Sequence, residues 1–81
     1  MDVPGGTYRH WKGPEYLVLG LGHDADDAAR TVVVYVPLYP VDGPPFAVRE
    51  VSDFRAWVNP ATGTVCGAGA PGAVQRFTRV R

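Results

Sequence analysis

A cysteine and two histidines are the residues of this chain whose types could support nucleophilic chemistry. The thiolate of Cys66 beside the imidazole of His10 or His23 would form a nucleophile and its base. Cys66 precedes a glycine-rich segment, residues 67–73, that would hold the thiol loosely, whereas a catalytic pair needs rigid support. We therefore predict no catalytic residue and a non-enzymatic protein, with an enzyme as the weaker alternative.

Two groups of side chains could bind a metal ion. His10, His23 and Asp24 are ligand types that suit zinc or iron, but nothing in the sequence places the two histidines together. The run Asp24–Asp27 offers carboxylates for calcium, but it lacks the mid-loop glycine and the final glutamate of an EF-hand loop. We predict no metal site and no cofactor.

Arginines are concentrated at the end of the chain. Residues 54–81 hold Arg55, Arg76, Arg79 and Arg81 without any acid, whereas residues 1–53 hold all eight acids. This pattern favours an exposed basic edge, with a specific anion site as the alternative. The formal net charge of zero argues against nucleic acid as a partner, and a nucleic-acid role for this arginine-rich end with Trp57 and Phe77 is a minor alternative.

The segment Thr31–Tyr39 is the most strand-like part of the chain, because its valines and tyrosines favour a pleated conformation. With a period of two, Val32, Val34, Val36 and Leu38 share one face, which we expect to be the core. The other face carries Tyr35 and Tyr39, whose rings can line a recess while their hydroxyls find polar partners.

Length and composition predict a single small β-domain. The chain has 81 residues with ten glycines and eight prolines, which suits short strands joined by tight turns. We expect an all-β, SH3-like barrel of five to six antiparallel strands with at most one short helical turn. Asp24 could begin such a turn, and so could residues 52–54. Residues 1–6 are predicted to be a flexible leader, and residues 7–81 the barrel domain.

The lone cysteine indicates where the protein works. Cys66 has no partner for an internal disulfide, so a reducing cytoplasm fits best. The first residues lack the pattern of a signal peptide, and no apolar run is long enough to suggest a membrane span. We expect a cytoplasmic protein with no membrane association.

Several motifs in the chain carry a family resemblance. They are Tyr8-Arg9-His10-Trp11-Lys12-Gly13, Tyr16-Leu17-Val18-Leu19-Gly20, His23, Val33-Val34-Tyr35, Leu38-Tyr39, Val48-Arg49, Phe54 and Arg76-Phe77. On these motifs, residues 7–80 resemble the small bacterial and phage proteins of domain-of-unknown-function family 1653. The chain departs from the family pattern after His23, at Pro40, at Phe46 or Ala47, at Glu50, and in the longer segment 60–73.

The resemblance implies a set of residues that folding alone does not demand, namely Arg9, His10, Tyr35, Tyr39 and Arg49. We infer that they line a shared recess for a small anionic ligand, such as one derived from a nucleotide, with the arginines as bidentate donors. A purely structural network remains open, with an arginine paired to Glu15 or Asp53.

Protein association is the alternative function. The aromatic residues Trp11, Tyr39, Phe46 and Trp57 could form a surface that meets another protein or a second copy of the chain. Small barrels often need more buried area than one chain provides, which favours a homo-oligomer within this alternative.

Overall fold

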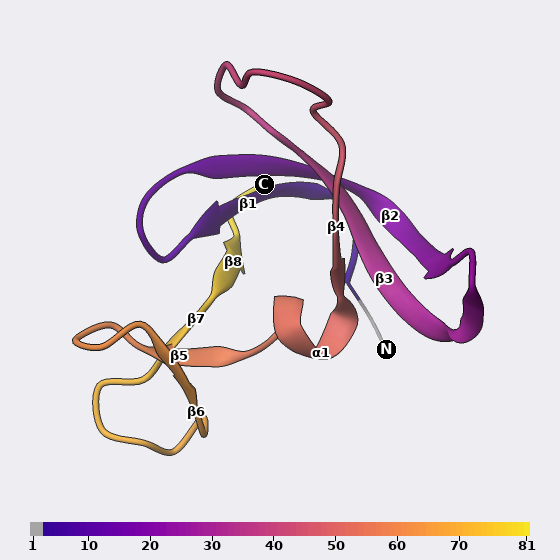
Figure 1. Cartoon of the computed structure of the whole chain (residues 1–81). Helices are drawn as coiled ribbons and strands as arrows, with labels where there is room; N and C mark the ends of the chain where they lie inside the picture. Colours follow the sequence, from indigo (N-terminus) through magenta and orange to yellow (C-terminus); the bar gives the residue numbers. More distant parts are fainter. Residues whose placement is uncertain (1–2) are drawn as a thin grey trace.

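The computed structural model describes residues 3–81 and consists of two antiparallel sheets with one short helix (Figure 1). Its elements within these residues are β1 (Gly6–His10), β2 (Glu15–Asp24), β3 (Asp27–Pro37), β4 (Ala47–Glu50), α1 (Val51–Phe54), β5 (Trp57–Asn59), β6 (Thr64–Cys66), β7 (Val74–Gln75) and β8 (Phe77–Arg79). The predicted all-β class with at most one short helical turn is confirmed. The strands number eight because the last third of the chain forms a small sheet of its own, β6-β5-β7.

The larger sheet has the order β4-β3-β2-β1-β8 and curls into a half-barrel that arches over α1 (Figure 1). Its longest pair is the hairpin of β2 and β3, where Tyr16 lies opposite Pro37 and Asp24 lies opposite Asp27. The register shifts between Val18 and Gly20, which leaves Leu19 unpaired as a β-bulge. Such a bulge bends the strand, and this bend contributes to the curl.

The helical turn expected after Asp24 is absent from the described residues, and a tight hairpin turn takes its place. The Asp26 backbone N–H donates a 2.8 Å hydrogen bond to Asp24 Oδ1. An aspartate side chain that accepts from the residue two positions later mimics a backbone turn. Strand pairing therefore continues to the very end of β2, and no residues are left over for a helix.

The core lies on the concave side of the large sheet, on the face of β3 opposite to the one predicted. Val33 and Tyr35 are buried there with Val18 of β2. On the predicted core face, Val32 is also buried but lies outside this core cluster, and Leu38 is 51% exposed. Valines alternate on both sides of β3, so periodicity could not choose between the faces. The choice is made by the rings of Tyr8, Phe54 and Phe77, which bring more apolar area to the concave side than the aliphatic side chains offer.

The helix α1 closes the open side of the curled sheet. Its buried residues are Val51 and Phe54, and the Phe54 ring stacks on Phe77 of β8 with a centroid distance of 4.2 Å. The sequence allowed a helical turn at Asp24 or at residues 52–54, and the structure has the helix at the second of these places. Val3 is also buried in this core cluster, so part of the predicted leader packs against the domain, while residues 1–2 lie outside the described residues.

The end of the chain pairs with its beginning. The Thr7 N–H donates to the Arg81 carbonyl over 2.8 Å, and β8 pairs with β1 so that Tyr8 lies opposite Arg79. The first and last strands of the chain therefore lie side by side, which places the C-terminal arginines beside the N-terminal segment.

Within residues 3–81, no helix has the length and apolar character needed to cross a membrane.

Candidate functional site

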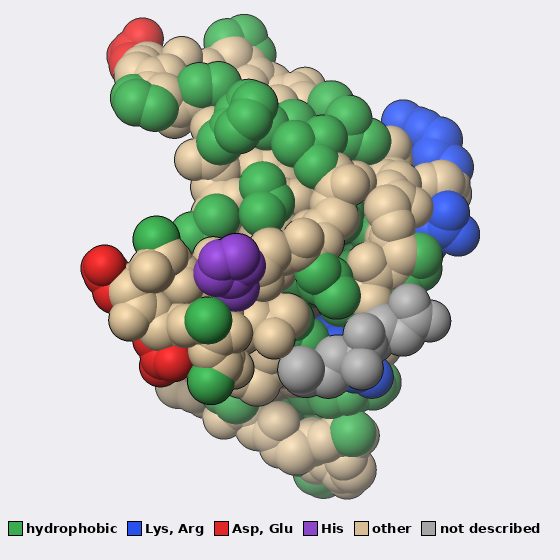
Figure 2. Space-filling view, turned by 90° about the vertical axis from the view of Figure 1, so that its right-hand side faces the viewer, with side chains coloured by type: hydrophobic (Ala, Val, Ile, Leu, Met, Phe, Trp, Pro, Cys, Tyr) green, Lys and Arg blue, Asp and Glu red, His purple; other side chains and the backbone are tan. Residues whose placement is uncertain are grey.

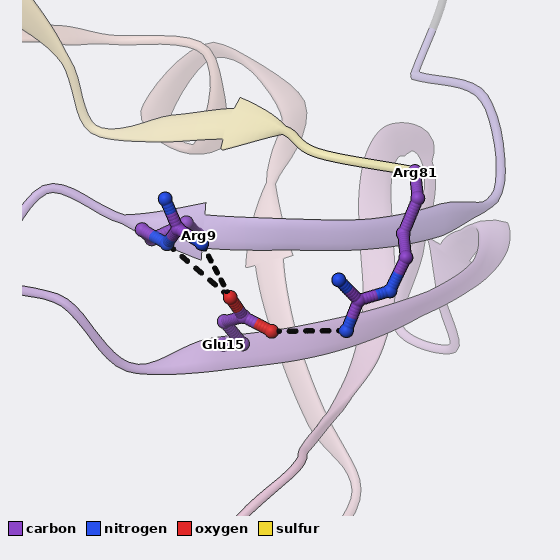
Figure 3. Close-up of polar contacts among 3 residues, drawn as sticks. All are labelled: Arg9, Glu15 and Arg81. Carbon is purple, nitrogen blue, oxygen red and sulfur yellow. Dashed lines mark hydrogen bonds and ion pairs between the residues drawn. The ribbon is translucent and has the colours of Figure 1, made fainter.

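Arg9 is separated from the other four predicted ligand residues. It lies on the outer face of β1, where its guanidinium forms an ion pair of 2.8 Å with Glu15 of β2 (Figure 3). Arg81 contacts the other carboxylate oxygen of Glu15 at 3.3 Å. The hydrogen bond from Arg9, together with the charge of Arg81, holds the pKa of Glu15 below its ordinary value. Arg9 thus adopts the pairing with Glu15 that the structural alternative allowed.

His10 points to the concave side of the sheet. Its ring meets Phe77 edge to face at 5.0 Å, and its Nδ1 accepts a 3.1 Å hydrogen bond from the Lys12 N–H. Burial lowers the pKa of His10 below 6.5, and the positive charges of Arg49, Arg76 and Lys12 lower it further. His10 therefore favours its neutral form in an electropositive part of the molecule.

Tyr35, Tyr39 and Arg49 come together around Tyr16, a residue that the prediction did not include. The Tyr16 and Tyr39 hydroxyls are 2.8 Å apart, and the Tyr16 and Tyr35 rings meet edge to face at 5.4 Å. Arg49 Nε donates to the Tyr35 hydroxyl over 3.3 Å. Burial and the hydrogen bond with Tyr39 raise the pKa of Tyr16 to about 12. The Tyr16 phenol is consequently a neutral hydrogen-bonding group across the physiological pH range.

Phe77 connects these residues to the core. Tyr35 and Tyr16 meet its ring edge to face at 5.7 Å each, and the Arg49 guanidinium lies 5.9 Å from its centroid. His10, Tyr35 and Arg49 thus surround Phe77 from β1, β3 and β4. They hold a ring that also forms part of a cavity wall.

That cavity, which we name the arginine cavity, has a volume of about 280 Å³. It is lined by Val3, Pro4, Tyr8, Phe54, Arg55, Gln75, Phe77 and Arg79. Its wall combines three aromatic rings with two guanidinium groups, and the described residues that line it include no acid. Such a lining suits a ligand that joins a flat apolar part to a negative charge.

The two cavity arginines have free hydrogen-bonding capacity. Arg79 Nη2 donates to the Gly5 carbonyl over 3.2 Å. The ion pairs found within residues 3–81 involve Arg9, Arg30 and Arg81, and none of them involves Arg55 or Arg79. A planar guanidinium keeps several N–H donors, so both arginines can bind an anion without first breaking an ion pair.

The sequence contained a signal for this cavity in its acid-free C-terminal part. The sequence predicts a basic edge there, with an anion site as the alternative, but it does not identify the aromatic neighbours of Arg55 and Arg79. Phe54 and Phe77 are 23 positions apart and stack only because α1 and β8 pack together. Tertiary packing therefore supplies the part of the site that local sequence patterns do not reveal.

A second cavity of about 340 Å³ lies at the β1 end of the sheet. It is lined by Arg9, His10, Trp11, Gly13, Val74, Gln75, Thr78 and Val80. Its one arginine, Arg9, already neutralises Glu15. The arginine cavity is therefore the better candidate for an anion.

The residues considered for metal or nucleophilic chemistry do not assemble in the described part of the chain. Residues 3–81 contain no group of three or more histidine, cysteine, aspartate and glutamate side chains that could hold a metal ion. His10 ends β1, whereas His23 lies near the far end of β2. Cys66 has a free thiol and ends β6 in the small sheet, opposite Trp57.

Comparison with known proteins supports the resemblance seen in the motifs. The sequence pattern of a family described as "Protein of unknown function (DUF1653)" matches residues 6–79. A comparison with the curated proteins finds no match. A crystal structure of a DUF1653 protein from Bordetella bronchiseptica is similar to this chain, with a TM-score of 0.78 and 35% sequence identity. The similarity covers 98% of this chain and 88% of the other. This chain therefore belongs to the DUF1653 family.

Proposed function

We propose that this protein is a non-enzymatic recognition module that binds a small anionic ligand with a planar ring in the arginine cavity. One observation carries the proposal: three aromatic rings and the guanidinium groups of Arg55 and Arg79 share one cavity of about 280 Å³. The buried rings provide an apolar wall, and the arginines provide bidentate donors to a phosphate or a carboxylate. A nucleoside monophosphate combines both chemical features.

The proposal keeps the predicted ligand chemistry and changes its location. His10, Tyr35 and Arg49 support the cavity through Phe77, and Arg9 lies outside it because it is paired with Glu15. The SH3-like character of the half-barrel and a bacterial, cytoplasmic setting belong to the same proposal. The curled sheet with two open edges supports the first, and the single free cysteine supports the second.

Titration with adenosine monophosphate, uridine monophosphate and benzoate, followed by NMR chemical shifts and thermal melting, tests the proposal. Adenosine without phosphate and inorganic phosphate alone separate the contributions of ring and charge. We expect the nucleotide or the carboxylate to bind more tightly than either control, because both parts of the cavity are then occupied. Arg55→Gln and Arg79→Gln should each weaken binding by about 10-fold or more, since a hydrogen bond to a charged group contributes about 1.5–3 kcal/mol.

Arg30→Gln is the matched control, because Arg30 pairs with Glu50 on the outer face of the sheet. It should leave the affinity unchanged. Arg49→Gln separates the arginine cavity from the predicted recess around Tyr35. A loss of binding in Arg49→Gln with no loss in Arg55→Gln or Arg79→Gln would move the site to that recess, and binding of none of the compounds would refute the proposal.

A further inference from the structure

The outer face of β2, β3 and β4 exposes large aliphatic and aromatic side chains. The side chains that we name the outer apolar face are those of Leu17, Leu19, Leu38, Phe46 and Val48. Their exposed fractions run from 36% for Leu17 to 68% for Phe46. Figure 2, which views the molecule from the side of the β2–β3 hairpin, shows hydrophobic side chains gathered over its upper part.

Strand pairing places Leu17 and Val48 on the same side of the sheet. Leu38 and Phe46 follow on that side by alternation just outside β3 and β4, and Leu19 lies in the bulge of β2. Leu17 lies opposite Val36, and Val34 lies opposite Val48, so β2, β3 and β4 contribute adjacent side chains to the same side. A Cβ atom on Gly22 would meet Val34 and Val32, which confirms that this side continues along the hairpin. The concave side already holds the core, and the outer apolar face is unpaired within residues 3–81.

The exposed area is large for a chain of this size. If a large side chain presents about 150–200 Å² when fully exposed, these five residues leave about 400–550 Å² of apolar surface in water. Isolated soluble proteins rarely expose contiguous apolar patches beyond a few hundred Å². Two such faces in contact would bury about 1,000 Å², which reaches the lower limit of a specific interface.

Charges at the two ends of this face are of opposite sign. At the hairpin end, Arg30 pairs with both Glu50 and Asp24, which leaves one negative charge. At the other end, Glu15 pairs with both Arg9 and Arg81, which leaves one positive charge (Figure 3). A copy turned by a two-fold axis across the strands would set the acidic end of each face over the basic end of the other. The face is therefore complementary to itself, as an isologous interface requires.

We propose that this protein forms a two-fold symmetric dimer through the outer apolar face, with the β2–β3–β4 sheets of the two copies packed face to face. A small core supports this occupant, because a chain with ten buried apolar residues among those described gains much from further apolar burial. The interface differs from the predicted aromatic surface, with which it shares Phe46. It shares no residue with the arginine cavity.

Sedimentation equilibrium over 1–500 µM, with light scattering after gel filtration, tests the dimer. The wild type should be dimeric at the higher concentrations, and Val48→Lys should raise the dissociation constant of the dimer by at least 10-fold. Val65→Lys is the matched control, since Val65 is 61% exposed and Val48 63%, but Val65 lies in the small sheet. Val65→Lys should associate like the wild type.

Leu19→Lys provides a second variant on another strand, and circular dichroism confirms the fold of each variant. A wild type that remains monomeric up to 500 µM would overturn the proposal. So would folded Val48→Lys and Leu19→Lys variants that associate as tightly as the wild type. An association broken by Val65→Lys instead would place the interface on the small sheet and contradict the proposed surface.

Discussion

At the scale of single residues, His10 reports the electrostatics of the concave side. Its folded-state pKa is lowered by burial and then by Arg49, Arg76 and Lys12, so the folded protein binds a proton there more weakly than the unfolded chain. The stability that His10 contributes is fully present above the unfolded pKa of 6.5 and is lost as the pH falls through the folded pKa. Acidification below neutrality should therefore destabilise the protein through this side chain.

Removing the charge of Arg49 should raise the pKa of His10. We expect Arg49→Gln to move the pKa upwards without restoring its ordinary value, because burial is the largest cause of the shift and remains. An NMR titration of the His10 ring measures the change. Arg30→Gln, on the outer face, should leave that pKa where it is in the wild type. A pKa unaffected by Arg49→Gln would show that the guanidinium does not act on the imidazole.

Arg9 shows that the residue type and the position in the fold decide different properties of a side chain. Its motif indicated a polar function, but the register of β1 against β2 places it opposite Glu15 on the outer face. Arg55 and Arg79 are exposed, as predicted for a basic edge, and packing also brings them to one cavity with aromatic rings. Residue type predicted anion chemistry, while strand register decided which arginines are available for it.

At the scale of elements, the start of β1 depends on a glycine. Gly6 has φ 140°, and a Cβ atom there would lie 2.5 Å from the Arg81 carbonyl oxygen. That oxygen accepts the Thr7 N–H and thereby seals the first strand against the end of the chain. The contact is with backbone, so it cannot be relieved by a side-chain rotation.

Gly6→Ala should lower the free energy of unfolding by about 1–3 kcal/mol, the cost of a strained backbone position. Gly67→Ala is the control, because no heavy atom lies within 4 Å of its Cβ position and its φ is not positive. It should change stability by no more than about 0.5 kcal/mol. Urea denaturation measures both values. Equal free energies of unfolding for the two variants would contradict the strain expected at Gly6.

Two short turns show how far local signals predict structure. The turn Asn59–Gly63 between β5 and β6 contains a proline and a glycine, which favour turns, and Asn59 Oδ1 accepts the Ala61 N–H at 2.9 Å. A hairpin turn at Ala25 and Asp26 takes the place of the predicted helical start, because aspartate serves both as a helix cap and as a turn residue. Local chemistry allows both structures, and the pairing of β2 with β3 selects one.

At the scale of the whole molecule, folding and association should be coupled. If the outer apolar faces pack together, the melting temperature should rise with protein concentration, since dimer formation stabilises only the folded state. For a domain of this size we expect a rise of about 5–10 °C over a hundredfold concentration range. Calorimetry measures it, with Val65→Lys behaving like the wild type. A melting temperature independent of concentration for the wild type would contradict this coupling.

The sequence by itself determined the β-rich class, the short helix at residues 52–54, the family and the chemical types available for binding. These follow from local propensities, turn residues and motifs, which act over a few neighbouring positions. Only the tertiary structure decided which face of β3 is buried, because valines occupy both faces and the rings of β1, α1 and β8 break the tie. The same packing brings Arg55 and Arg79 beside Phe54 and Phe77 in one cavity and leaves Leu19 and Val48 exposed. Contacts between distant segments decide which face of a strand is buried and which side chains meet in one cavity. A periodic pattern within one strand does not specify them.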